Sequence, residues 1–117
     1  MSPERVALLI QGHPSLYALG AKRIEFRCRD GWFDLLRILS ERLDEIGDVQ
    51  VQQVKEKFGE LRVYTNAPYP SAAWEATEDA MRGSRSICER CGIPSGSRRM
   101  RGNWIVTECD ECIKRDP

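Results

Sequence analysis

The chain has 117 residues, of which 41% are hydrophobic and 31% are charged, and its formal net charge is zero. Because a useful core needs on the order of 50 to 100 residues, this length allows one ordinary domain, or one small domain followed by a metal-stabilised appendix. The composition excludes a disordered or fibrous chain, and the zero net charge excludes an overall positive field that would attract a polyanion.

Neither a membrane-spanning helix nor a secretory signal is expected. No window approaches roughly 18 uninterrupted apolar residues, and the apolar run from Val6 to Ile10 is short. The chain has five cysteines, whereas a secreted disulfide scaffold normally uses an even and denser set. We therefore expect a soluble protein of a reducing cytoplasm, with thiolates available to bind a metal.

The first predicted strand follows a weakly specified segment. Residues 1 to 23 are interrupted by glycine and proline, so at most a short helix is expected there, near residues 14 to 19. From residue 24 to residue 29 apolar and polar side chains alternate, which predicts a strand. Three side chains share its apolar face: Ile24, Phe26 and Cys28. Cys28 is therefore expected to be a small core residue.

An amphipathic helix is predicted from Trp32 to Ile46, because apolar residues recur there at three-and-four spacing with charged residues between them. Asp30 is a candidate N-cap, since its carboxylate could accept a hydrogen bond from an unpaired amide of the first turn. Gly47 is a candidate C-terminal stop.

A β-hairpin is predicted next, with strands at residues 49–54 and 61–65 and a turn at or near Gly59. The apolar period slips between Val51 and Val54, which indicates a β-bulge in the first strand. The charged connection is expected to keep the sheet edge soluble, with Phe58 folded over the core.

A third helix completes the predicted fold. Ser71 is a candidate N-cap for a helix from Ala72 to about Ser86, which leads directly to Cys88. The predicted fold class is α+β: a small antiparallel sheet packed by two helices, followed by a C-terminal four-cysteine zinc ribbon. The predicted division is a body over residues 1–83 and a ribbon over residues 84–117.

Four cysteines in the last third of the chain have the spacing of a zinc ribbon: Cys88, Cys91, Cys109 and Cys112. Two residues separate the members of each pair, so one tight turn can aim both sulfurs at a common point about 2.3 Å away, and two such turns complete a tetrahedron. One structural zinc ion is the expected cofactor, and it replaces the core that so short a segment lacks. Two disulfides, a redox-active pair and an iron–sulfur cluster are the alternatives.

No catalytic residue is predicted. Four thiolates close the coordination shell, whereas a catalytic zinc keeps one position open for water. The single histidine, His13, lies beside Pro14 and is expected to have a surface or capping role. An enzyme would have to rely on carboxylates such as Asp34, Glu56 and Glu60 converging in the fold, and no spacing supports this.

Six basic residues in two segments are candidate partner-binding residues: Lys55, Lys57, Arg62, Arg98, Arg99 and Arg101. The second segment lies beside Trp104, whose indole could serve as a stacking surface next to phosphate contacts. The first could present its charges to an acidic partner from an exposed hairpin. The simpler interpretation of both is a solvated hairpin, with Trp104 in the core.

Several motifs occur together along the chain: His13-Pro14-x-Leu16-Tyr17, Asp30-Gly31-Trp32-Phe33-Asp34-Leu35, Val54-Lys55-Glu56-Lys57-Phe58-Gly59-x-Leu61-Arg62-Val63-Tyr64 and the Cys88 knuckle. As a set they resemble a family of small, functionally uncharacterised proteins encoded by bacteria and phages. The resemblance implies a compact α+β body followed by a zinc knuckle, in the cytoplasm of a bacterial or phage-infected cell, and it supplies no catalytic residues. Family members end in a Cys-Asp-x-His-like element, where this chain has a fourth sulfur, at Cys112.

These observations favour a small non-enzymatic zinc-binding adaptor that recognises a macromolecule. Protein is the expected partner class rather than nucleic acid, because zero net charge removes the usual long-range attraction to phosphates. The alternatives are a phage-encoded inhibitor of a host defence or regulatory complex, and a nucleic-acid-binding zinc-ribbon protein. No membrane partner is expected, and the sequence leaves the oligomeric state open.

Overall fold

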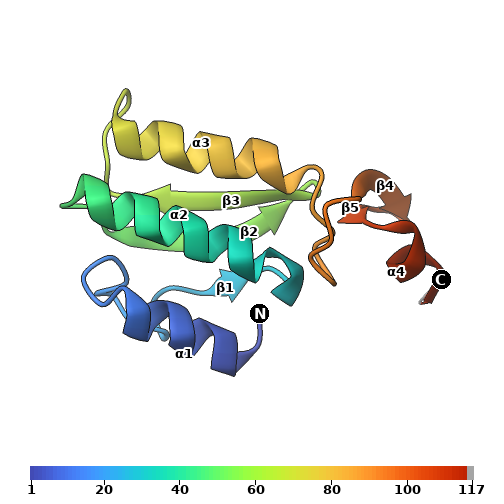
Figure 1. Cartoon of the computed structure of the whole chain (residues 1–117), viewed down its shortest axis with the longest axis horizontal. Coiled ribbons are helices and arrows are strands. Elements are labelled where there is room, and N and C mark those ends of the chain that lie inside the picture. Colours follow the sequence, from blue (N-terminus) through green and yellow to red (C-terminus); the bar gives the residue numbers. More distant parts are fainter. Residues whose placement is uncertain (116–117) are drawn as a thin grey trace.

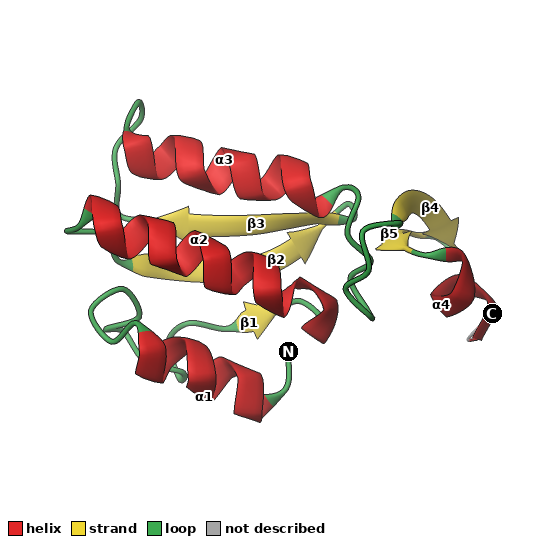
Figure 2. Cartoon of the chain, viewed as in Figure 1, coloured by secondary structure: helices red, strands yellow, loops and turns green. Residues whose placement is uncertain are grey.

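The first part of the chain is a three-stranded sheet with helices on one of its faces, and a smaller hairpin unit follows it at the C-terminal end (Figures 1 and 2). The computed structural model describes residues 1–115. Its elements are, in chain order, α1 (Pro3–Gly12), β1 (Phe26–Arg27), the 3-10 helix η1 (Asp30–Trp32), α2 (Phe33–Ile46), β2 (Val51–Lys57), β3 (Glu60–Thr65), α3 (Ala72–Ser84), β4 (Ser97–Arg101), β5 (Trp104–Glu108) and α4 (Asp110–Arg115). The α+β class with a terminal four-cysteine unit is therefore as the sequence predicts.

The sheet has the order β1-β2-β3. Strands β2 and β3 form the predicted antiparallel hairpin, whose turn consists of Phe58 and Gly59 with φ values of 56° and 78°. Two left-handed residues in succession are typical of a tight turn that follows the twist of its strands. The predicted bulge is also present, as a shift of register between Val51 and Gln53. Strand β1 differs from the prediction, because it pairs with β2 in parallel through the α2 crossover.

Helices α2 and α3 lie side by side across one face of the sheet (Figure 1). Helix α3 begins as predicted, with the Ser71 hydroxyl accepting a hydrogen bond from the backbone N–H of Trp74. At α2 the prediction that Asp30 is the N-cap is wrong. Asp30 opens η1 instead, and its carboxylate accepts a hydrogen bond of 2.8 Å from the backbone N–H of Ser2, which itself caps α1.

Helix α1 was not expected from the sequence, and the short helix predicted near residues 14–19 is a series of turns. The start of α1 has a recognisable signal, since Ser2 is a good N-cap and Pro3 suits the first helical position. Leu9 is buried in the core and attaches this helix to the body. The strand predicted over residues 24–29 is also shorter, because only Phe26–Arg27 pair with β2.

The core lies between the sheet and its helices, and its largest side chain is Trp32, which is fully buried. Cys28 is a core residue as predicted, and burial raises the pKa of its thiol to about 12. Two aromatic side chains contradict the sequence-based expectation of burial: Phe58 is 56% exposed and Trp104 is 76% exposed. Both lie at hairpin ends, where no helix covers them.

The C-terminal unit consists of the β4–β5 hairpin, which turns at Gly102 and Asn103 as predicted, and the short helix α4. Within residues 1–115 none of the helices has both the length and the apolar character required to cross a bilayer.

Candidate metal centre

The first cysteine pair lies on a tight turn that follows α3. The backbone N–H of Gly92 donates to the carbonyl of Cys88 over 2.9 Å, and the N–H of Cys88 donates to the carbonyl of Ile93 over 3.0 Å. Gly92 has φ of 84°, a conformation in which a side chain would be strained. The turn therefore fixes the direction in which both Cys88 and Cys91 present their sulfurs.

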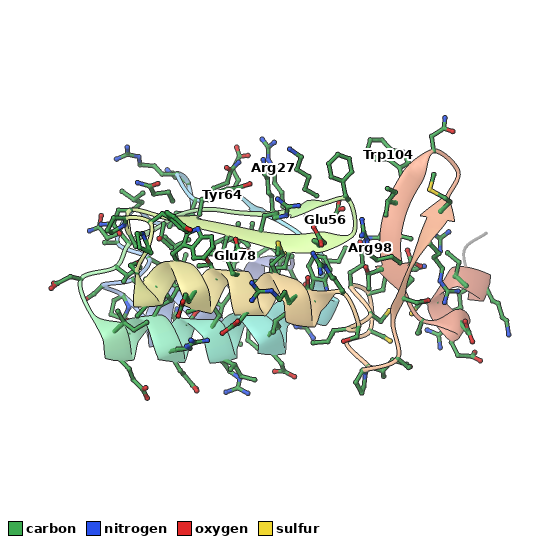
Figure 3. All side chains as sticks on the ribbon, turned by 90° about the horizontal axis from the view of Figure 1, so that it is seen from above. Arg27, Glu56, Tyr64, Glu78, Arg98 and Trp104 are labelled. Atoms are coloured by element: carbon green, nitrogen blue, oxygen red, sulfur yellow. The ribbon has the colours of Figure 1, made fainter. Side chains whose placement is uncertain are left out.

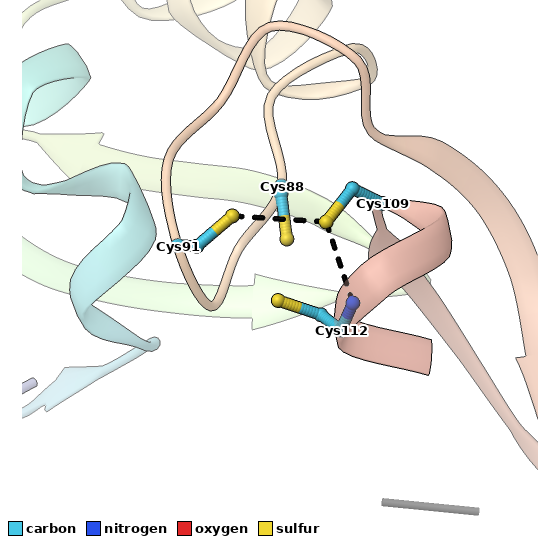
Figure 4. Close-up of side chains that lie close together, drawn as sticks. All are labelled: Cys88, Cys91, Cys109 and Cys112. Carbon is cyan, nitrogen blue, oxygen red and sulfur yellow. Dashed lines mark hydrogen bonds between the residues drawn. The ribbon is translucent and has the colours of Figure 1, made fainter. Parts of the chain in front are cut away.

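The second pair lies where β5 ends and α4 begins. Cys109 is the residue between the two elements, and Cys112 is in the first turn of α4. The backbone N–H of Cys112 points at the Cys109 sulfur over 3.5 Å (Figure 4). Amide groups directed at sulfur favour the thiolate, which is the form that binds metals.

The four sulfurs converge on one point, with all of them within 4.8 Å of one another (Figure 4). Cys91 Sγ and Cys109 Sγ are 3.7 Å apart. A disulfide would bring two sulfurs to about 2.05 Å, whereas four thiolates at about 2.3 Å from a shared ion are about 3.8 Å apart. All five cysteines of the chain are free thiols, so the cluster has the dimensions of a metal site and not of a pair of disulfides.

The electrostatics of the cluster also suit a cation. Burial disfavours the Cys88 thiolate, but backbone N–H groups of Cys91, Cys109 and Arg90 outweigh it and lower the pKa of Cys88 to about 6. Burial, followed by the three neighbouring sulfurs, raises the pKa of Cys112 to about 12. Cys88 therefore ionises more readily than Cys112, and a divalent ion at the centre of the cluster would favour the thiolate form of both.

The first knuckle is packed against the body at the Asp30-Gly31-Trp32 motif. The indole N–H of Trp32 donates to the carbonyl of Ile87 over 2.9 Å, and the backbone N–H of Gly31 donates to the carbonyl of Glu89 over 2.9 Å. A Cβ atom at Gly31 would lie 2.2 Å from the Cys88 carbonyl oxygen, so only glycine fits here. The sequence showed these residues as a motif without indicating that they hold the cysteine turn.

The hairpin of the ribbon is fastened to the β2–β3 turn. The Thr107 hydroxyl donates to the carbonyl of Gly59 over 2.5 Å, and the Arg98 guanidinium donates two hydrogen bonds, of 2.7 and 3.1 Å, to the carbonyl of Phe58. A Cβ atom at Gly59 would lie 3.0 Å from the Thr107 hydroxyl oxygen. The division of the chain at residue 83 stays a prediction, but the contacts that cross it are numerous and specific.

Two buried carboxylates next to the ligands support this junction. Glu108, which precedes Cys109, is fully buried and is paired with Arg101 at 2.8 Å and with Arg29 of the body at 3.3 Å. Burial raises the pKa of Glu108 but hydrogen bonds and charge from the arginines lower it more. Glu89 accepts a hydrogen bond of 2.9 Å from the backbone N–H of Thr107, and burial raises its pKa. The sequence analysis did not predict that either glutamate is buried. The available signal was that each is adjacent to a cysteine of the cluster, Cys88 or Cys109.

All four predicted partner-binding arginines make internal contacts. Arg98 binds the Phe58 carbonyl, Arg99 pairs with Asp110 at 3.0 Å, Arg101 pairs with Glu108, and Arg62 pairs with Glu60 at 2.7 Å. The two lysines differ from these arginines. The ammonium of Lys55 lies 5.4 Å from the centre of the Tyr64 ring, and that of Lys57 lies 5.6 Å from the centre of the Phe58 ring.

The other polar residues considered as candidates lie apart from the cluster. His13 is the C-cap residue of α1, where its backbone N–H donates to Leu9 and its ring contacts Asp44. This agrees with the predicted capping role. Of the three carboxylates considered for an enzyme, Asp34 is exposed on α2, Glu56 accepts a hydrogen bond from the backbone N–H of Gly59, and Glu60 is buried between Arg85 and Arg62.

Comparison with known proteins gives no assignment: no family model, no curated protein and no solved structure matches the chain. The site defines a small α+β protein whose C-terminal unit is consistent with a zinc ribbon, because its four clustered cysteines can hold a metal ion.

Proposed function

We propose that the protein is a non-enzymatic adaptor, stabilised by one structural zinc ion, that recognises a macromolecule in the bacterial cytoplasm. The observation that carries this proposal is the clamp between the ribbon and the β2–β3 turn. It places two exposed aromatic residues, Phe58 and Trp104, in neighbouring segments, since Gly59 packs against Val106 and Ile105. Large exposed aromatic side chains on a fixed support are typical of binding surfaces.

Zinc is the metal that the donor set supports best. Four thiolates in a tetrahedral arrangement select zinc or iron–sulfur chemistry, and the Cys-x2-Cys pairs match structural zinc sites. Four protein ligands leave no coordination position for a substrate or for water, so the metal would stabilise the ribbon without taking part in a reaction. A reducing cytoplasm would keep the thiols available for the ion.

We propose a bacterial or phage-infected cell as the setting of the adaptor, because its motifs resemble those of proteins encoded by bacteria and phages. A phage-encoded inhibitor of a host defence or regulatory complex would use the same surface, by occluding its target. In both cases the surface is expected to act only when the ribbon is folded, because Trp104 belongs to β5 and Phe58 to the body.

The test is affinity capture from cells with zinc-loaded protein and three variants. We expect partners to be retained by the wild type and by Tyr69→Ala, which removes an exposed aromatic ring far from the ribbon clamp in sequence. The same partners should be lost with the Phe58→Ala/Trp104→Ala double variant and with Cys109→Ser. If a partner is captured equally well by the double variant, the surface at the clamp is not the recognition site and the proposal fails.

A further inference from the structure

The zero net charge of the chain conceals a separation of charge between its layers. The two long helices α2 and α3 together carry seven acidic and three basic residues, whereas the three strands of the body carry two acidic and four basic residues. The two strands of the ribbon carry one acidic and three basic residues. Because α2 and α3 cover one face of the sheet, their acidic surplus is separated from the side chains of the opposite face, which include Arg27, Lys55 and Arg62. Net charge was the reason for disfavouring nucleic acid, and this distribution removes that reason.

The sheet face opposite the helices has basic residues in register. The strand pairing places Arg27 beside Lys55 and Lys55 beside Arg62, so one cation from each strand forms a row across the sheet. Arg27 contacts Glu25, and Arg62 contacts Glu60. Among the described carboxylates none is paired with Lys55 or Lys57, so both ammonium groups are available to phosphates.

Three exposed aromatic side chains belong to the two hairpins, at Tyr64, Phe58 and Trp104. Tyr64 is 41% exposed and alternates with the buried Val63, so its ring belongs to the open face. Phe58 is at the hairpin tip, roughly 20 Å from Tyr64 at about 3.3 Å per residue. Figure 3 shows Trp104 on the ribbon hairpin beyond that tip, on the same side as Arg27 and away from α2 and α3. The lysines lie beside the first two of these rings.

A hollow of about 340 Å³ lies at the end of the sheet next to the ribbon, lined by residues of β1, β2 and β5. Trp104 is at its rim, and Arg27, Arg29, Glu56 and Glu89 contribute charged groups to its lining. Glu89 is only 3% exposed, so a carboxylate is held at a fixed position in the wall. Guanidinium donors and carboxylate acceptors beside an exposed ring are the groups that recognise the edge of an unstacked base.

We infer that the open sheet face binds single-stranded nucleic acid, with bases stacked on Tyr64, Phe58 and Trp104 and phosphates held by Lys55, Lys57 and Arg27. The inference rests on the proposed function and names the partner class of the same surface. The side chains of an acidic protein segment that would satisfy the lysines have no rings, whereas every nucleotide pairs a phosphate with a flat base that can stack on an aromatic side chain. Base–aromatic stacking together with a basic track is the recurring way of binding single strands.

The experiment measures binding of fluorescein-labelled single-stranded DNA and RNA of about 12 nucleotides to the zinc-loaded protein, by anisotropy at several salt concentrations. We expect a Kd of about 1–10 µM at low salt, and binding at least about tenfold tighter than to a duplex of equal length, because stacking requires exposed bases. Three phosphate contacts predict a slope of log K against log salt of about −2.

Matched variants distinguish the effects of base stacking and of local charge on binding from the effect of net charge. Lys55→Glu/Lys57→Glu and Arg37→Glu/Arg42→Glu change the net charge equally, but the second pair is on α2. The lysine pair should weaken binding at least about tenfold and flatten the salt slope, and the arginine pair should change Kd less than about twofold. Trp104→Ala should weaken binding about tenfold, and Tyr69→Ala should not.

Circular dichroism and zinc content confirm that each variant is folded before binding is measured. Equal weakening by the two charge-reversal pairs, equal affinity for duplex and single strand, or no binding below about 100 µM at low salt would each overturn the inference. The proposed function fails separately. A partner that survives nuclease treatment, and whose capture depends on Phe58 and Trp104, would leave the adaptor intact and replace nucleic acid by protein.

Discussion

The body and the ribbon hold their shapes by different means. In the body a continuous apolar cluster, which includes Trp32, Leu36 and Val54, lies between the sheet and the helices. In the ribbon the buried cluster consists of three cysteines, Cys88, Cys109 and Cys112. The comparison teaches that one fold can combine a core specified by many weak contacts with a unit specified by four ligands, so the two parts should respond differently to the same perturbation.

The largest expected effect is that of metal removal or of Cys109→Ser. The ribbon should lose its order while the body stays folded, because structural zinc contributes on the order of 10 kcal/mol in small modules and the body has its own core. The measurement is amide hydrogen exchange of residues 88–112 against residues 33–65, with elemental analysis giving about one zinc per chain in the wild type. If residues 88–112 exchange their amide hydrogens as slowly in the metal-free protein as in the zinc-loaded protein, the ribbon does not depend on the metal for its order.

Trp32→Ala should destabilise the body by leaving a cavity in its core. We expect a loss of about 3–5 kcal/mol in the free energy of unfolding, because the side chain is fully buried and its indole N–H binds the Ile87 carbonyl. Trp104→Ala is the matched control, and it should cost less than about 0.5 kcal/mol, since that ring is exposed. Urea denaturation followed by circular dichroism measures both values, and equal losses would show that Trp104 is packed.

Gly31→Ala should sharpen the comparison at the junction of the two parts. Its Cβ atom would lie 2.2 Å from the Cys88 carbonyl, so the knuckle must move, at a cost of about 1–3 kcal/mol and with faster zinc loss to a chelator. Gly12→Ala is the control, since nothing lies within 4 Å of its added Cβ atom. If both alanine variants release zinc at the wild-type rate, the body does not support the knuckle.

Glu60→Gln should have a smaller, pH-dependent effect within the body. Burial opposes ionisation of Glu60, but hydrogen bonds from Arg85 and Arg62 outweigh it and lower its pKa. A lowered pKa means that the stabilisation is fully present above the unfolded pKa of about 4.3 and is lost as pH falls through the folded value. The variant should lose about 2 kcal/mol at neutral pH and less in acid. Glu75→Gln on the surface of α3 is the control, and it should cost less than about 0.5 kcal/mol at neutral pH.

Most elements that depend on residues close together in the sequence were predicted correctly. Alternation and three-and-four spacing specified the hairpin of β2 and β3 and the helices α2 and α3, and the Cys-x2-Cys spacing specified the cluster, because ligand positions within a turn are set by a few bonds. Helix α1 was missed although Ser2 and Pro3 carry a recognisable start signal. The capping residues at the start of α1 were therefore sufficient to predict this helix.

The contacts that join the two parts could not be predicted in the same way. The approach of Gly31 to Cys88 and the burial of Glu89 and Glu108 depend on which surfaces meet in three dimensions, and no periodicity encodes that. The exposure of Trp104 also depends on the three-dimensional arrangement and could not be predicted from the sequence pattern. An aromatic residue on a strand is usually buried, and here the ribbon is thin enough that one side of its hairpin faces solvent.

Of the four sulfur ligands only Cys91 belongs to an exposed residue. We therefore expect a chelator, an oxidant or a metal-carrying thiol to reach the cluster first at the Cys91 sulfur. The same turn carries Glu89, whose carboxylate accepts the hydrogen bond from Thr107 of β5, so the exposed corner lies next to the contacts that hold β5. Under the proposed function, zinc supply and the redox poise of the cell would therefore act on partner binding through this one exposed cysteine.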